Sequence, residues 1–139
     1  MRDGTLWSAD AHGGVVRIAP GGTQQLIAAT EQVKFSDADG EEARFTEGTL
    51  PNGLSFTENG DILIANYGID LLEQMTRSGQ TTTLYDNIDG KAMGKVNFVL
   101  RDSKNRIWLT ISTRAVNWMR SFTPEVDDGY VALVDRGTI

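Results

Sequence analysis

The sequence contains no cysteine and no long apolar run, and each of these absences excludes a class of protein. Without cysteine, the chain can form neither disulfides nor thiolate metal sites. No segment approaches the ~18 consecutive apolar residues of a membrane-spanning helix, and the polar start, Met1-Arg-Asp-Gly4, lacks the apolar core of a signal peptide. A formal net charge of −6 argues against nucleic acid or an anionic membrane as partner. The 40% apolar content instead predicts a globular chain, without indicating its compartment.

A short pattern that occurs more than once organises the sequence. Asn52 opens an apolar segment, a polar turn follows, and a second apolar segment begins eight residues later at Gly60. The same arrangement returns 45 residues further on, from Asn97 to Asn105, and its second half also occurs at residues 3–9. Periods of about 40 to 50 residues are typical of β-propellers, in which each repeat is one blade.

Glycine and proline at the turns, β-branched residues between them and the lack of a 3.6-residue apolar stripe predict an all-β fold. We expect a partial β-propeller of about three four-stranded antiparallel blades. The opening strand of the first repeat is expected upstream of Met1. The single domain, 1–139, is divided into an incomplete first blade, an acidic loop, a complete second blade and an incomplete third blade, at 1–29, 30–50, 51–90 and 91–139.

Successive antiparallel strands place their turns at alternate ends of a sheet. The short turns therefore share one end, whereas the long loops share the other, where function is usually found. Asn52 and Asn97 start strands at the long-loop end, so we expect both to face the propeller channel, at the same end as His12 and Trp118.

Three segments carry a resemblance to a known family. They are Leu50-Pro-Asn-Gly-Leu54, Gly90-Lys-Ala-Met-Gly-Lys-Val-Asn-Phe98, and Asn105-Arg-Ile-Trp-Leu-Thr110 followed by Ser112-Thr-Arg114. The sequence resembles the senescence marker protein/gluconolactonase family, six-bladed propellers that include calcium- or zinc-dependent lactonases. The resemblance covers about the first three blades of that family.

The resemblance implies a divalent metal at the channel mouth, with calcium as first choice and zinc as second. Asn97 matches a metal-binding Asn of the family, although Phe98 stands where the family motif usually continues with Asp. Asn52 would line the substrate site, and Arg114, Asn117 and Trp118 would cap a substrate. The remaining ligands, a Glu and an Asp, are expected before Met1 and beyond Ile139, so the site within this chain would be incomplete.

Two functions stay open. The first is a fragment of a metal-dependent hydrolase of small lactones or esters, inactive alone, with an unassigned general base. The second is a non-catalytic propeller module that binds a ligand or a protein through its long-loop face. From the residues alone, Asn97 is either a ligand or a turn residue that satisfies its own backbone. A homodimer of two three-bladed chains could complete the ring.

Overall fold

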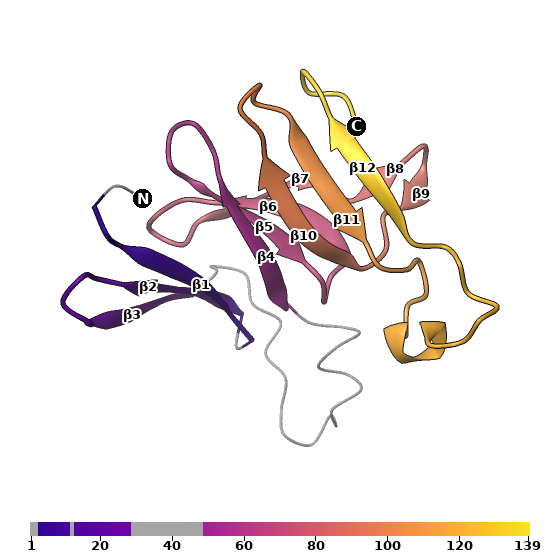
Figure 1. Ribbon diagram of the computed structural model, residues 1–139, viewed down its shortest axis with the longest axis horizontal. Coiled ribbons are helices and arrows are strands. Elements are labelled where there is room, and N and C mark those ends of the chain that lie inside the picture. The colour runs from indigo at the N-terminus through magenta and orange to yellow at the C-terminus, as the bar shows by residue number, and fades with distance from the viewer. Residues whose placement is uncertain (1–2, 12, 29–48) are drawn as a thin grey trace.

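The computed structural model describes residues 3–11, 13–28 and 49–139. Three antiparallel sheets stand side by side as the blades of a partial propeller (Figure 1). His12 and most of the predicted acidic loop, 30–50, lie outside the described residues. The all-β fold class and the partial propeller are confirmed.

Blade 1 consists of β1 (Leu6–Asp10), β2 (Gly14–Ile18) and β3 (Gln24–Ala28). Blade 2 consists of β4 (Pro51–Phe56), β5 (Ile62–Asn66), β6 (Leu71–Met75) and β7 (Thr81–Tyr85). Blade 3 consists of β10 (Val96–Arg101), β11 (Ile107–Ile111) and β12 (Tyr130–Val134). In each blade, hydrogen-bonded neighbours follow chain order.

Two small elements lie outside the blades. The segment that joins blades 2 and 3 contains a hairpin of β8 (Asn87–Ile88) and β9 (Lys91–Ala92). A single 3-10 turn, η1 (Trp118–Ser121), interrupts the excursion between β11 and β12. No helix in the described part of the chain is long and apolar enough to cross a membrane.

The repeat has a structural basis in two matching turns. Gly60 and Asn105 both adopt positive φ, at 87° and 64°. The Gly60 amide donates to the Thr57 carbonyl oxygen and the Asn105 amide to the Asp102 carbonyl oxygen, each at 3.0 Å. Glycine and asparagine are the residues that enter this left-handed region most readily, and the predicted eight-residue spacing therefore coincides with equivalent hairpins in blades 2 and 3.

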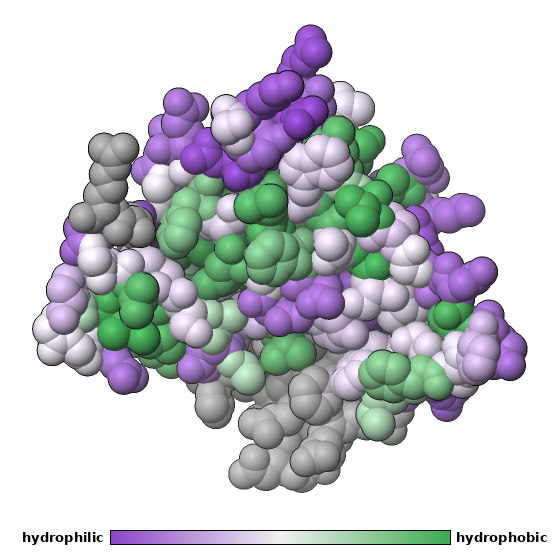
Figure 2. All heavy atoms as spheres, viewed as in Figure 1, coloured by the Kyte–Doolittle hydropathy of each residue, from purple (hydrophilic) through white to green (hydrophobic). Residues whose placement is uncertain are grey.

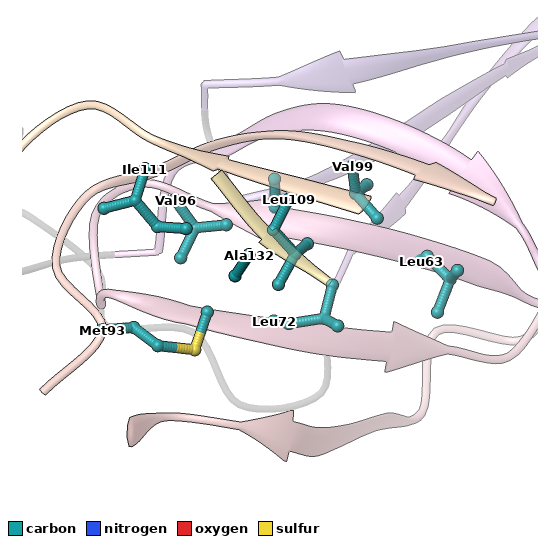
Figure 3. Packing of buried hydrophobic residues seen from close by; sticks show 9 residues of the cluster. Leu63, Leu72, Met93, Val96, Val99, Leu109, Ile111 and Ala132 are labelled. Atoms are coloured by element: carbon teal, nitrogen blue, oxygen red, sulfur yellow. The ribbon is translucent and has the colours of Figure 1, made fainter. Parts of the chain in front are cut away.

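Strand β5 is buried on both faces because it lies between two other blades. Ile62 and Ile64 join a core cluster that contains Val15 and Ile27 of blade 1. The alternate residue Leu63 packs with blade 3 (Figure 3). Successive side chains of a strand point to opposite faces, so an uninterrupted apolar run is what a strand between two blades requires.

The outer faces of blades 1 and 3 have no such cover among the described residues. On blade 3, the exposed fractions of Leu100 and Val131 are 51% and 64%. On blade 1, those of Leu6 and Leu26 are 65% and 50%. Figure 2 shows hydrophobic side chains gathered over β10 to β12 and, separately, over the first sheet. Both outer faces are therefore apolar surfaces of the kind that mediate association.

The inner strands β4 and β10 approach each other closely at Gly53. A Cβ atom at this position would lie 2.6 Å from the Phe98 Cα and 3.0 Å from the Asn97 carbonyl oxygen. Nearby, Arg101 donates from its backbone amide to the Ser55 hydroxyl at 3.1 Å and from Nε to the Phe56 carbonyl at 2.6 Å. Glycine thus allows two blades to meet through their backbones.

A fully buried lysine lies between blades 2 and 3. The Lys95 ammonium is 2.8 Å from an Asp70 carboxylate oxygen, and the Lys95 side chain has no exposed surface. The ring of Tyr67 lies with its centroid 6.0 Å from the ammonium. Removing Asp70 would leave a fully buried ammonium without a counter-charge, whereas the Asp70 carboxylate is 29% exposed and could be solvated if the lysine were removed.

We expect Gly53→Ala to lower the free energy of unfolding by about 1 to 3 kcal/mol, since β4 must move away from β10 to admit the methyl group. Urea denaturation measures the change. Gly21→Ala is the matched control, because nothing lies within 4 Å of the Cβ it would add and its φ is not positive. Equal stability of both variants would contradict the close approach.

We also expect Asp70→Asn to destabilise the chain by about 3 kcal/mol, because the buried ammonium loses its counter-charge, and Lys95→Met to cost less, because the carboxylate that remains is partly exposed to water. Asn tolerates the positive φ of Asp70, 60°, so the first variant isolates the lost charge. Thermal and urea unfolding compare the two. A larger loss in Lys95→Met than in Asp70→Asn would show that the lysine is not paired as described.

Candidate functional site

Asn52 and Asn97 occupy equivalent irregularities of the two inner strands. The register of β4 with β5 shifts between Pro51 and Leu54, and that of β10 with β11 shifts between Val96 and Phe98. A bulge of this kind redirects a side chain and interrupts the ladder. Both asparagines are exposed, and Asn52 Nδ2 donates to Asn97 Oδ1 at 2.7 Å.

The hydrogen-bonded chain continues beyond the asparagine pair. Asn97 Nδ2 donates to the Ser112 hydroxyl at 3.1 Å. Tyr67 directly follows β5 and Ser112 directly follows β11, so these two residues are separated by the same 45-residue step as Asn52 and Asn97. Asn52, Asn97 and Ser112 therefore form one hydrogen-bonded line at the long-loop end, and Tyr67 lies at the same end as a wall of the adjoining cavity.

A cavity of about 620 Å³ opens beside this line. Tyr67 and Trp118 form an aromatic corner, with ring centroids 6.1 Å apart and planes at 78°. Blade 1 contributes only small side chains, and none of the described lining residues is charged. The described residues that line the cavity are Ser8, Ala9, Ala11, Leu50, Pro51, Asn52, Tyr67, Asn97 and Trp118.

Asp128 fixes the base of the excursion that carries Trp118. Its carboxylate accepts from the Thr113 hydroxyl at 2.7 Å and from the Arg114 amide at 2.8 Å. These hydrogen bonds, that of the Thr113 hydroxyl foremost, lower the pKa of Asp128, because they stabilise the ionised form. Asp128 is therefore ionised at neutral pH and ties the two ends of the excursion together.

Two of the predicted substrate-capping residues have structural contacts in this state. The Arg114 guanidinium donates to the Ala92 carbonyl at 2.7 Å and lies 4.6 Å from the centroid of the Tyr130 ring. The Asn117 side chain accepts from the Met119 amide at 3.0 Å and thereby caps η1. Neither residue lines the cavity, whereas Asn52, Asn97 and Trp118 do.

The Tyr67 hydroxyl is a proton donor at neutral pH. Burial raises the pKa of Tyr67 above its ordinary value. A neutral phenol at a cavity wall can donate to a carbonyl or hydroxyl oxygen of a ligand.

The described residues match a divalent cation only in part. Amide carbonyl oxygens, such as Asn97 Oδ1, are suitable ligands for calcium, but calcium takes 6 to 8 oxygens. Within residues 3–11, 13–28 and 49–139, no group of three or more His, Cys, Asp or Glu side chains is arranged to hold a metal ion. A metal site at this mouth would therefore need carboxylates beyond the asparagine pair.

Tyr67, Ser112 and Asp128 were missed by the sequence interpretation. The 45-residue step provided a signal for the first two, because the residue after the second strand of a blade lies at the same edge as the residue that opens the first strand. No pattern indicated Asp128, since its partners depend on how a 16-residue excursion folds back, from Thr113 to Asp128.

No protein-family model matches this sequence, and no curated protein matches it. The comparisons that succeed are with solved structures. A gluconolactonase from Xanthomonas campestris superimposes with a TM-score of 0.68 and 16% identity, over 96% of this chain and 41% of that one. A protein assigned as a gluconolactonase by a structural genomics consortium gives a TM-score of 0.68 at 13% identity, over 99% and 43%.

Catalytically inactive virginiamycin B lyase from Staphylococcus aureus, solved with quinupristin, superimposes over 80% of this chain and 32% of that one, with a TM-score of 0.57 and 19% identity. This chain therefore spans less than half the length of each of these three proteins. At such low identities, the similarity shows a shared propeller fold and leaves activity to be argued from the site.

Proposed function

We propose that this chain is part of a divalent-metal-dependent hydrolase of small lactones or esters, with its site at the mouth of the propeller channel. The observation that carries the proposal is the Asn52–Asn97 hydrogen bond of 2.7 Å beside the cavity. This hydrogen bond brings two side-chain amides, whose oxygen atoms are potential metal ligands, together from two blades at the end that carries the long loops. The shared fold with two gluconolactonases supports it.

In this proposal, Asn97 holds the cation through Oδ1, with calcium as first choice and zinc as second. A bound cation of this kind polarises a lactone carbonyl and lowers the pKa of water. Asn52 orients the Asn97 amide, while Tyr67 and Trp118 form the wall against which a ligand ring would pack. Arg114 and Asn117 would contribute to a substrate cap only after leaving their present partners.

Hydrolysis also needs a general base. The described residues that line the cavity do not supply one, because they include neither a carboxylate nor an imidazole. The chain is therefore expected to be inactive without further residues. The same observation favours a second candidate function, a non-catalytic module that binds a small uncharged ligand or a protein on its long-loop face. Carboxylates that reach the channel mouth near Asn97 would distinguish the hydrolase from the module.

Titration with calcium and with zinc, followed by the side-chain amide signals in ¹⁵N NMR spectra, tests the metal. We expect the Asn97 signals to shift with half-saturation at about 1 mM or above, since affinity depends on the number and charge of the ligands. Asn97→Ala removes these signals, so the calcium-induced shift of the neighbouring Asn52 amide is followed instead and should be lost. Asn59→Ala, in a turn at the opposite end of the sheets, should preserve the response.

Two results would overturn this assignment. The absence of any Asn97 response well above the millimolar range would remove the cation from the proposal. Lactone hydrolysis that survives Asn97→Ala would place the chemistry elsewhere in the molecule.

The proposed partner is a second copy of this chain, which would supply blades to a shared channel. In the 45-residue register, Trp108 of β11 corresponds to Leu63 of β5, the residue that blade 3 covers. When the turns at Gly4 and Gly60 are aligned, exposed Leu6 of β1 corresponds to Ile62, which faces the preceding blade. The outer face of blade 3 thus has the pattern that accepts a following blade, and that of blade 1 has the pattern that covers a preceding one.

We expect the chain to associate at ~10 to 100 μM, where exposed strand edges and apolar faces promote association. Sedimentation velocity measures this, and Val131→Glu should shift the distribution toward monomer. Thr82→Glu, on β7 at the outer edge of blade 2, serves as the control and should not. A stable wild-type monomer across that range would refute the second copy as partner.

A further inference from the structure

A second cavity, of about 290 Å³, lies between blades 2 and 3 at the short-turn end of the sheets. It is lined by residues of the turns that follow β4 and β10 and of the strands beside them, and it shares no described lining residue with the cavity at the channel mouth. We propose that this second cavity binds a small monocarboxylate that carries an alkyl or aryl group. The proposal is independent of the proposed function.

One wall of the second cavity is apolar. Leu63 belongs to the core cluster between blades 2 and 3 and lies at one end of it (Figure 3). Leu84 of β7 and Ile107 of β11 pack against the same cluster, but they are only partly buried and also line the cavity. A hydrocarbon group placed against these two side chains would remove their remaining apolar surface from water, which favours binding.

Arg101, at the end of β10, supplies a positive charge in a fixed orientation. Its Nε donates to the Phe56 carbonyl oxygen at 2.6 Å, and its Nη1 donates to the Asn105 side-chain oxygen at 2.8 Å. The Arg101 backbone amide donates to the Ser55 hydroxyl at 3.1 Å. With two of its nitrogen atoms anchored, the guanidinium is already ordered, so a ligand need not immobilise it on binding.

The Arg101 guanidinium retains donors for a ligand. A guanidinium has five N–H groups, and its hydrogen bonds to described residues use two of them. Among the residues that the structure describes, no carboxylate forms an ion pair with Arg101. A fixed, half-buried guanidinium without a counter-charge is suited to an anion, and a carboxylate has the planar shape that matches its parallel N–H groups.

The charges around the second cavity limit the ligand to a single negative charge. Glu58, an exposed carboxylate in the turn after β4, lines the same cavity, and the whole chain has a formal net charge of −6. A dicarboxylate or a phosphate monoester would be repelled by these charges more strongly than a monocarboxylate. The volume is also at the lower end of the range for ligand pockets, which favours a small molecule.

Titration with hexanoate, followed by ¹H–¹⁵N NMR, tests the site. Hexan-1-ol has the hydrocarbon chain without the charge, and acetate has the carboxylate without the chain. The readout is the ligand concentration that half-saturates the shift of the Asn105 side-chain amide signals. Arg101→Gln removes the guanidinium. Arg136→Gln is the matched control, because it removes the same charge from an exposed turn at the same end of the sheets.

A second variant keeps Arg101 in place. Arg101→Gln also removes hydrogen bonds between blades 2 and 3, and could therefore change the fold as well as the charge. Leu84→Phe retains these hydrogen bonds and places a larger side chain in the cavity wall. The side-chain amide signals of Asn52 and Asn97, at the opposite end of the sheets, report whether each variant keeps the native packing.

We expect hexanoate to half-saturate the Asn105 response at about 1 to 10 mM, the range for a small ligand with one ion pair. Hexan-1-ol and acetate should each bind at least about tenfold more weakly, because each lacks one of the two favourable contacts. Arg101→Gln should weaken hexanoate binding about tenfold or more. Leu84→Phe should also weaken it, since the added ring occupies the place of the hydrocarbon, whereas Arg136→Gln should match wild type.

Three results would overturn the proposal. The first is the lack of a saturable response to hexanoate at concentrations tenfold above the expected range. The second is equal binding of hexan-1-ol and hexanoate, which would show an apolar cavity in which the guanidinium has no part. The third is equal binding of acetate and hexanoate, or unchanged hexanoate binding in Leu84→Phe, which would show that Arg101 attracts anions without the cavity.

Discussion

The backbone contact between β4 and β10 at Gly53 is the constraint on which the candidate site depends. Inner strands of neighbouring blades can approach this closely only where one of them lacks a Cβ atom. A Cβ atom added at Gly53 would lie 2.6 Å from the Phe98 Cα, which is too close for a normal contact. Asn52 precedes Gly53 and Asn97 precedes Phe98, so the same contact brings the two amides within hydrogen-bonding distance. The packing of the blades and the chemistry of the site thus share one cause.

The burial pattern distributes stability unevenly over the three blades. Every residue of β5 is buried, because blades 1 and 3 cover its two faces. Blades 1 and 3 each bury one face against blade 2 and expose apolar side chains on the other. Blade 2 therefore has the largest share of the cooperative core, and the long-loop end is built from segments attached to it.

Much of the fold could be predicted from the sequence, and the reason is local. A turn that needs positive φ selects glycine or asparagine, and a strand between two blades selects a continuous apolar run. Gly60, Asn105 and residues 62–65 reveal these requirements directly. The shared end of Asn52 and Asn97 follows from strand parity alone. What could not be predicted depends on contacts between distant segments: the Lys95–Asp70 pair, the Asn97–Ser112 hydrogen bond, and the contacts of Arg114 with Ala92 and Tyr130.

Asp128 closes the excursion between β11 and β12 at its base, so that this closure does not depend on the residues inside the loop. Its carboxylate holds the Thr113 hydroxyl and the Arg114 amide, so the ends of the loop are joined by side-chain bonds next to the sheet. The entropy of closing a loop grows only slowly with its length, and here the closure does not depend on the residues inside. Residues 115–127 can then change in length and sequence at little cost to β11 and β12. A propeller that keeps this clasp can alter what covers its channel mouth while leaving its blades unchanged.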